Sequence, residues 1–287
     1  MPQAREESLF MIRTMTTAVN TMNQLQHRLD LIGNNLANTA THGYKSSDAK
    51  FQELLFQQMN NDKADRADRR SEDGIRIGSG AMLGSMQMNW KVGSVQVTDR
   101  QLDFALTEPK QYFNLIQPTE GGEEIIYSRK GNFYVSPMDN GQNMLVNEEG
   151  LPVADSAGRP IVFSGQATNY NVHPNGLLEI TQPGGNQTFE LGVTVLEKPD
   201  SMVRLSATNF GLPADMAGLG LEANDLLTEM TGAARSQIGL QNRALETSNV
   251  NYEKEMTDLI ATQRAYQFNA RSVTLADQML GLINGIR

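Results

Sequence analysis

The chain contains no cysteine among its 287 residues. Disulfide bonds, thiol nucleophiles and cysteine-ligated metal sites are therefore excluded. Histidine is also scarce: His27, His42 and His173 are the three that occur, and they do not fall at a zinc-binding spacing. Aromatic residues make up 6% and hydrophobic residues 39% of the sequence. This composition favours one modest core and long elements that bury surface only against partners.

Positive charge is in deficit, and long apolar runs do not occur. The formal net charge is −9 and the isoelectric point is about 4.9, which argues against a nucleic-acid partner. No stretch reaches the roughly 18 apolar residues of a membrane-spanning helix. The apolar segment of a secretory signal does not follow Met1. We expect no membrane insertion and, if the protein leaves the cytoplasm, export without a cleaved signal peptide.

The residues that could carry chemistry do not form a recognisable catalytic pattern. Glu123-Glu124 and Glu148-Glu149 each lie beside a turn signal, where carboxylates usually project into water. A glycosidase would need two carboxylates that face one groove. The glycine pair in Gly78-Ser79-Gly80 is not followed by the Lys-Ser/Thr of a phosphate-binding loop. We therefore expect no enzyme activity, no catalytic residue, no cofactor and no metal ion.

A regular apolar stripe occupies the N-terminal region. Residues 1–10 are polar and precede it, as an upstream extension would, so we expect the helix to begin at Met11 and to end near Asn38-Thr39, before Gly43. The stripe repeats with spacings of 4 and 3 residues, the heptad pattern of a helix packed lengthwise on another helix. Its positions are Met11, Met15, Ala18, Met22, Leu25, Leu29, Ile32 and Leu36.

A second heptad stripe lies at the C-terminal end, on a helix expected from Val250 to Ile286. Gln263 and Asp277 interrupt it as polar positions. Two heptad helices at opposite ends of a chain are expected to pair with each other, and we predict that their seams form the assembly interface. The seam positions of the second helix are Tyr252, Met256, Leu259, Tyr266, Ala270, Val273 and Leu280.

The middle of the chain has the alternation and turns of an antiparallel sheet. Runs such as residues 94–98 and 189–195 alternate in polarity, and glycine-containing turn signals separate them. The expected class is therefore α+β, with paired terminal helices and a β-rich middle. The expected domains are a helical assembly domain at 11–45 plus 243–287, a connector at 46–92 with a short helix at 51–56 and a Gly-rich extended stretch, a β domain at 93–210 and a return connector at 211–242.

The most specific signals are two polar motifs beside the helices. The first is Asn34-Asn35-Leu36-Ala37-Asn38-Thr39-Ala40-Thr41-His42-Gly43-Tyr44-Lys45. The second begins with Leu245-Glu246-Thr247-Ser248-Asn249-Val250-Asn251 and continues with Gln263-Arg264-Ala265-Tyr266. Both resemble the terminal signatures of the flagellar axial family of rod and hook proteins. The motif positions that carry this resemblance are Asn34, Asn35, Ala37, Asn38, Thr41, Gly43, Tyr44, Lys45, Ser248, Asn249, Val250, Gln263, Arg264 and Tyr266.

Within that family the middle resembles the distal rod proteins more than the hook proteins. Residues 51–57, 74–81 and 93–98 follow the rod pattern. The chain departs from it where family members carry a Gly-x-Gly turn before two aromatic residues, because here the sequence is Glu108-Pro109-Lys110-Gln111. The departure questions the geometry of that hairpin and suggests a divergent paralogue, such as the rod-like proteins of Gram-positive bacteria.

The resemblance implies a function and a place in the cell. The protein would be exported by the flagellar type III apparatus, polymerise with copies of itself, contact neighbouring rod and hook proteins, and form the drive shaft of the basal body. Gly43 would end the helix, and Tyr44 and Lys45 would point the chain outward. A hook, proximal rod or cap scaffold protein is the close alternative, and a non-flagellar coiled-coil fibre subunit is the distant one.

Overall fold

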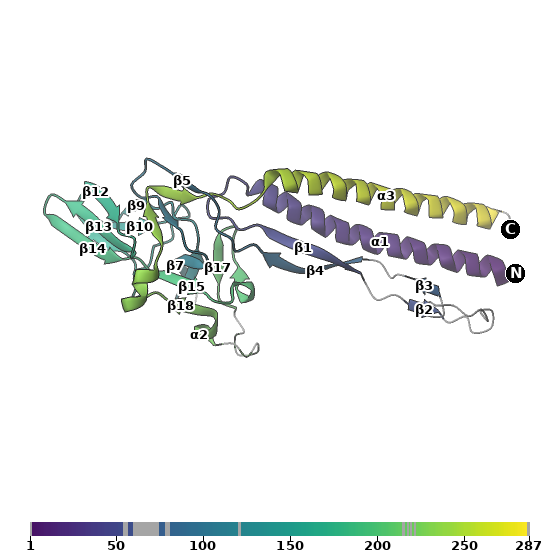
Figure 1. The fold of residues 1–287 in the computed structure, drawn as a ribbon, viewed down its shortest axis with the longest axis horizontal. Helices are drawn as coiled ribbons and strands as arrows, with labels where there is room; N and C mark the ends of the chain where they lie inside the picture. The colour runs from purple at the N-terminus through teal and green to yellow at the C-terminus, as the bar shows by residue number, and fades with distance from the viewer. Residues whose placement is uncertain are drawn as a thin grey trace. The chain divides into compact units, whose positions relative to one another are not determined.

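The protein has the expected α+β class: an N-terminal helix, a β-rich middle and a C-terminal helix. The computed structural model describes residues 2–53, 57–59, 75–77, 81–119, 122–213, 216, 218, 220 and 222–285. Packing divides the chain into two units, shown in Figure 1. The helical unit contains Met1–Leu36, Ser47–Gln87 and Asn251–Arg287, and the β unit contains Ala37–Ser46 and Met88–Val250. The four-part division expected from the sequence stays a prediction.

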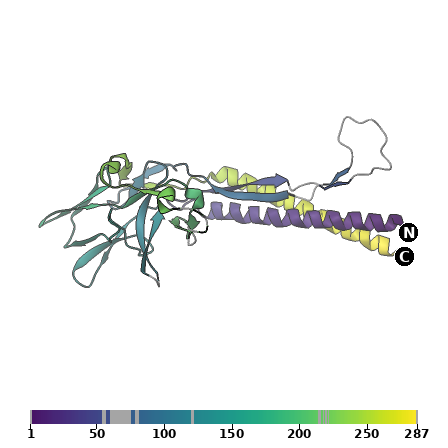
Figure 2. The ribbon, with the colours of Figure 1, turned by 90° about the horizontal axis from the view of Figure 1, so that it is seen from below.

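The helical unit is built from two long helices and short strands. Helix α1 (Pro2–Ala37) and helix α3 (Tyr252–Gly285) run beside each other in both views (Figures 1 and 2). An ion pair between Arg28 and Asp258 joins them, with 3.6 Å between the nitrogen and oxygen atoms. The strands of this unit are β1 (Ser47–Glu53), which pairs with β4 (Ala81–Met88), and β2 (Gln57–Met59), which pairs with β3 (Ile75–Ile77).

Helix α1 begins earlier than expected and ends where expected. It starts at Pro2 and not at Met11, so that boundary was wrong. Proline fits the first turn of a helix, and residues 3–10 contain neither glycine nor proline. The apolar period locates the buried stripe only, whereas polar residues can extend the helix beyond it. The helix ends at Ala37, before Gly43, as predicted.

The expected stripe of α1 is the less exposed side of the helix. Every seam position from Met15 to Leu36 is half-buried or buried, and Leu25 and Ile32 are the most buried of them. Polar positions between them, such as Asn20 and Asn23, are exposed. The side chain of Met11 lies outside the described residues. The seven-residue period therefore located the inward side of this helix.

On α3 the inward stripe is displaced from the expected one. The expected positions from Met256 to Leu280 are all half-buried, whereas Tyr252 is exposed. The fully buried side chains are Glu255, Thr262 and Ala276. Together with Leu259, Tyr266, Val273 and Leu280 they form a stripe at heptad spacing, in which the buried residues lie one position before Met256 and before the polar interruptions Gln263 and Asp277. The expected positions stay a prediction of the assembly interface, and hydrophobicity did not indicate the more buried stripe because Glu255 and Thr262 are polar.

The short helix expected at residues 51–56 does not form where the structure describes it. Residues 51–53 belong to strand β1, and residues 54–56 lie outside the described residues, as does the glycine pair at 78 and 80. In β1 the buried Ser47 and Ala49 alternate with the exposed Asp48 and Lys50. This two-residue period is that of a strand with one covered face.

The β unit consists of antiparallel strands in several small sheets around one six-stranded sheet. The six-stranded sheet has the order β16-β17-β8-β7-β15-β18. Its strands are β7 (Gln111–Thr119), β8 (Gly122–Ser128), β15 (Val193–Leu196), β16 (Val203–Arg204), β17 (Asn209–Gly211) and β18 (Leu227–Glu229). The three-stranded sheets are β11-β10-β9, from β9 (Tyr134–Pro137), β10 (Gln142–Val146) and β11 (Val162–Ser164), and β12-β13-β14, from β12 (Asn169–Val172), β13 (Leu177–Gln182) and β14 (Gly185–Glu190).

Two further strand pairs bring the end of the β unit back to its beginning. Strand β20 (Ala244–Glu246) pairs with β5 (Val95–Val97), and β19 (Leu240–Asn242) pairs with β6 (Phe104–Leu106). The main hydrophobic core lies among these sheets and includes Phe104, Phe113 and Phe133. A smaller cluster around Tyr112 and Phe210 includes the half-buried Trp90.

The region expected as a return connector contributes ordered strands. Besides helix α2 (Ala223–Leu226) and the short helix η2 (Gly232–Gln237), it supplies β18 and β19, and the short helix η1 (Pro199–Ser201) precedes it. Leu227 and Leu240 are buried in these strands. Their runs are only three residues long, too short for an alternation pattern to be recognised.

The turn that departs from the family pattern keeps an unusual backbone. Lys110 has a φ of 62°, in the left-handed region that glycine adopts most easily. The Lys110 carbonyl accepts a hydrogen bond from the Leu196 amide at 2.9 Å, which fixes the turn against β15. The turn does not close a hairpin, because β6 pairs with β19 whereas β7 pairs with β8 and β15, so it links strands of two different sheets.

Candidate functional site

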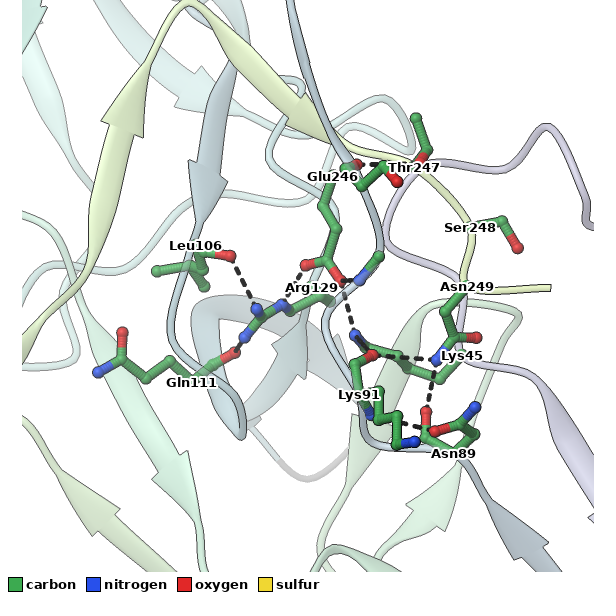
Figure 3. Close-up of polar contacts among 12 residues, drawn as sticks. Lys45, Asn89, Lys91, Leu106, Gln111, Arg129, Glu246, Thr247, Ser248 and Asn249 are labelled. Atoms are coloured by element: carbon green, nitrogen blue, oxygen red, sulfur yellow. Dashed lines mark hydrogen bonds and ion pairs between the residues drawn. The ribbon is translucent and has the colours of Figure 1, made fainter. Parts of the chain in front are cut away.

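The two polar motifs meet inside the β unit. The Gly43 amide donates to the Glu246 carbonyl at 2.9 Å, and the Asn249 amide donates to the Tyr44 carbonyl at 3.4 Å. Residues 37–46 thereby lie against the strand end and loop that precede α3, although about 200 positions separate them in sequence (Figure 3). We call this meeting point the motif junction, defined by residues 37–46, 89–94, 129 and 244–250.

Glu246 lies at the centre of the motif junction. One carboxylate oxygen accepts hydrogen bonds from Lys45 Nζ at 2.6 Å and from the Gly93 amide at 2.8 Å. The other accepts from Arg129 Nε at 2.5 Å. The side chains of Glu246, Lys45 and Arg129 are 1%, 2% and 0% exposed, so all three charges lie away from solvent.

Arg129 is satisfied mainly by backbone carbonyl groups. Its two terminal nitrogens donate to the Gln111 carbonyl at 2.5 Å and to the Leu106 carbonyl at 2.8 Å (Figure 3). Its guanidinium carbon lies 5.8 Å from the centre of the Tyr112 ring. A guanidinium group with its fixed fork of donors suits such a buried position better than an ammonium group would. Arg129 therefore ties strands β6 and β7 to the carboxylate of Glu246.

The charges of the motif junction do not balance, because one carboxylate faces two cationic groups. Burial lowers the pKa of Lys45, and the nearby charge of Glu246 only partly opposes this effect. Burial alone would raise the pKa of Glu246, but the charges and hydrogen bonds of Arg129 and Lys45 outweigh it and lower that pKa. Glu246 is therefore ionised at neutral pH and faces two cations.

The Asn249 side chain makes the backbone hydrogen bonds that a neighbouring strand would otherwise make. Its side-chain oxygen accepts from the Ser46 amide at 2.7 Å, and its side-chain nitrogen donates to the carbonyls of Asn89 at 2.6 Å and Lys91 at 3.0 Å. One amide side chain thus satisfies backbone groups of two irregular segments.

Gly43 and Tyr44 are required by close packing. Gly43 has a φ of 72°, and a Cβ atom there would lie 2.8 Å from the Arg129 carbonyl carbon, so both its backbone conformation and its space favour glycine. Tyr44 is completely buried, and the guanidinium carbon of Arg204 lies 4.7 Å from its ring centre. The side chains of Tyr44 and Lys45 both turn inward and fill the junction, and the expectation that these residues direct the chain outward stays a prediction.

Comparison with known proteins identifies both motif regions. Residues 15–45 match the family described as "Flagella basal body rod protein", and residues 241–286 match "Flagellar basal body rod FlgEFG protein C-terminal". The flagellar hook-basal body complex protein FlhP of Bacillus subtilis is 38% identical over 284 residues, which cover 96% of this chain and all of that protein. The chain belongs to the flagellar basal-body rod protein family.

Other relatives in this family are rod proteins by name. The flagellar basal-body rod protein FlgG of Buchnera aphidicola (subspecies Schizaphis graminum) is 30% identical over 281 residues, covering 94% of this chain and 98% of that protein. The FlgG protein of Bacillus subtilis is 29% identical over 276 residues, covering 94% of this chain and 97% of that protein. The similarity to rod-like proteins of Bacillus agrees with the paralogue suggested by the sequence.

A second group of family-motif residues lies in the helical unit. Asn35 is buried, although its neighbours suggested a polar face; its side-chain nitrogen donates to the Ser47 carbonyl at 2.8 Å and its oxygen accepts from the Ser47 amide at 3.1 Å. It also hydrogen-bonds Glu255, whose pKa burial raises. Asn35 thus ties the end of α1 to the start of β1 and to the first turn of α3.

The remaining family-motif positions lie in less buried places. Ala37, Asn34, Gln263 and Arg264 are exposed, and Tyr266 is half-buried. In the β unit, the Thr41 hydroxyl donates to the Asn38 side chain at 3.1 Å, and the Ser248 hydroxyl accepts from the Val250 amide at 3.3 Å. The structure therefore gathers the motif positions from Ala37 to Lys45 and from Ser248 to Val250 in the junction and leaves the α3 positions outside it.

Sequence reasoning missed Arg129 and the role of Glu246. Glu246 lies in the second family motif, but neither it nor Arg129 was assigned a partner. Glu246 is the one charged residue between Ala244 and Tyr252, which could have marked it as a buried acid. Arg129 is 117 positions from Glu246 and carries no signal that predicts the pairing.

Across the described residues, no helix is long and apolar enough to cross a membrane.

Proposed function

We propose that the chain is a structural subunit of the flagellar basal-body rod, and that copies of it polymerise helically into the shaft between motor and hook. The observation that carries this proposal is end-to-end similarity: relatives named rod proteins align over 94% of this chain and 97–98% of their own length. The motif junction supports a structural role, because Lys45, Arg129 and Glu246 are buried in contacts with the chain itself.

Assembly needs a surface that a second copy can cover, and α3 offers one. Phe268, Leu275, Met279 and Leu282 are 71%, 59%, 47% and 68% exposed. Their spacings of 7, 4 and 3 residues place them on one side of the helix. We call them the outer stripe. Exposed apolar patches of this kind usually mark protein–protein contacts, and we propose that a neighbouring subunit covers this one.

The seam residues complete the proposal for the terminal helices. We propose that Met11 to Leu36 on α1 and Met256 to Leu280 on α3 hold the helices as a coiled-coil-like pair. The heptad spacing, the half-burial of these side chains and the Arg28–Asp258 ion pair support it. Because many of these positions remain half-exposed, we propose that folding of the chain ends is completed only when neighbouring subunits bind.

The proposed location follows from the same relationship. We propose export by the flagellar type III apparatus without a cleaved signal, a place in the basal body beyond the cytoplasm, and contacts with neighbouring rod and hook proteins. The relatives' names place them in the basal body or the hook-basal body complex.

The outer stripe gives a direct test of polymerisation. Leu275→Asp puts a charge into the proposed contact, whereas Thr274→Asp puts the same charge about 100° around the helix. In cells with the variant as their sole copy, we expect Leu275→Asp to be exported but to give few complete rods in electron micrographs and less than about a tenth of normal swimming. The Thr274→Asp cells should build rods and swim.

The amount of Leu275→Asp protein found outside the cytoplasm distinguishes a failure of export from a failure of assembly. If Leu275→Asp accumulates outside the cytoplasm while rods are missing, assembly is the step that fails. Normal rods with Leu275→Asp would show that the outer stripe is not a subunit contact. Tagged protein that sits in the hook, with unchanged rods in cells that lack the protein, would overturn the rod assignment itself.

A further inference from the structure

The segment Ala37–Ser46 is joined to the rest of the β unit by docking and not by strand pairing. The remainder of that unit is the continuous stretch Met88–Val250. The docked segment is described throughout and contains no strand. Its backbone contacts are a few single hydrogen bonds, among them the Gly43 amide to Glu246 and the Asn89 amide to the Ser46 carbonyl. It can therefore leave without breaking a sheet.

The docked segment brings a surplus charge with it. Glu246 already has Arg129 as its partner within Met88–Val250, with 2.5 Å between the bonded atoms. Docking adds the ammonium group of Lys45, which is left 2% exposed. Removing an ammonium group from water costs free energy, and a carboxylate that is already paired returns only part of it. Tyr44 burial favours docking and Lys45 burial opposes it.

We propose that Ala37–Ser46 is a reversible latch: it undocks from Met88–Val250 while the β core stays folded, because Lys45 adds an unbalanced positive charge to the docked state. The proposal goes beyond the rod function, since it concerns how one chain opens and not what it assembles into. An opening of this kind would release the segment that follows α1 without unfolding the β unit.

The hydrogen bonds around Lys45 show that its charge can be removed cleanly. The Lys91 carbonyl, which Lys45 contacts at 2.7 Å, also accepts from Asn249 at 3.0 Å. The Glu246 oxygen that Lys45 contacts also accepts from the Gly93 amide at 2.8 Å. Lys45→Met therefore leaves no acceptor without a donor, keeps a flexible apolar stem and restores charge balance between Glu246 and Arg129.

Hydrogen exchange of the full-length wild-type protein tests the latch first. The Gly43 amide is bonded to Glu246 across the docked contact, and the Ile116 amide is bonded to the Pro152 carbonyl at 2.8 Å within the core. We expect Gly43 to exchange at least about ten times faster than Ile116, at a rate that low guanidinium concentrations barely change, as in local opening. Equal protection with equal denaturant dependence at both amides would overturn the latch.

The variant then tests the role of the charge. Lys45→Met should slow exchange at Gly43 by about tenfold relative to wild type, because the docked state gains stability. Lys198→Met, at an exposed lysine of the same unit, should leave that rate unchanged. An unchanged or faster rate in Lys45→Met would show that the charge does not weaken docking. If that variant does not fold, Lys45 stabilises the junction and the proposal is likewise overturned.

Discussion

Replacing Glu246 by glutamine should be among the most damaging single changes in the β unit. The carboxylate accepts three hydrogen bonds, from Lys45, Gly93 and Arg129, and all of its charged partners are at most 2% exposed. Glutamine has nearly the same shape but no charge. Arg129 would then remain buried in the core without a counter-ion, Lys45 would be unpaired whenever its segment is docked, and the new amide group would turn a donor toward one of them.

The expected loss can be estimated from buried ion pairs in other proteins. Removing one partner of such a pair costs about 3–5 kcal/mol, because the other charge stays buried and uncompensated. For a unit of this size, 1 kcal/mol corresponds to roughly 2–4 °C in the unfolding temperature. We therefore expect the β unit of Glu246→Gln to unfold on the order of 10 °C below wild type.

The single tryptophan provides the assay. Trp90 packs on Phe210 with 5.8 Å between ring centres, so its fluorescence reports unfolding of the β unit. Urea and thermal unfolding at pH 7 should be compared with Glu123→Gln, which removes the same charge from an exposed position. Adding Lys45→Met to Glu246→Gln should recover part of the loss, since it removes one unpaired cation. A loss below about 1 kcal/mol would refute the reasoning, because it would mean that solvent reaches the site.

Two further outcomes follow from the turn and from the titration of Glu246. Lys110→Gly should stabilise the β unit by about 0.5–1 kcal/mol, because glycine relieves the left-handed backbone but loses more entropy on folding; Lys198→Gly, where φ is −119°, should instead destabilise it. In urea unfolding followed by Trp90, the wild type should lose stability as the pH falls below the ordinary Glu pKa of 4.5 toward the lowered folded pKa of Glu246. Glu246→Gln should lack that part of the slope, and parallel slopes would contradict the assignment of the lowered pKa.

The elements that the sequence predicts well are those long enough to show several repeats of a hydrophobic period. Helix α1 ends within a residue or two of the expected Asn38, and its stripe of Leu25 and Ile32 is buried as the heptad requires. The antiparallel middle is found because strands of four to seven residues are long enough to show alternation and because glycines at φ > 0, such as Gly141 and Gly176, punctuate them.

The elements that the sequence does not predict depend on contacts between distant residues. Short strands such as β18 and β19 are too brief to show a period. Residues 51–53 at the end of β1 were predicted as part of a helix, although Ser47 and Ala49 earlier in the strand alternate with exposed neighbours. On α3, the buried Thr262 and Glu255 were excluded by their polarity. Each is placed by its tertiary partners, and local propensity gives no information about those partners.

The family motifs are polar because of where the chain must bend. Between α1 and β1, and again between β20 and α3, the backbone leaves regular structure while parts of it stay buried, so its amide and carbonyl groups need other partners. Asn35 pairs with both backbone groups of Ser47 in the helical unit, and Asn249 bonds the backbone of three residues in the β unit. An apolar residue of similar size at position 35 could fill the space but would leave both buried backbone groups of Ser47 unsatisfied, at about 1–3 kcal/mol each. The polar residues of the motifs therefore stabilise the two bends of the chain. Their positions in the sequence, after α1 and before α3, follow from where the chain bends.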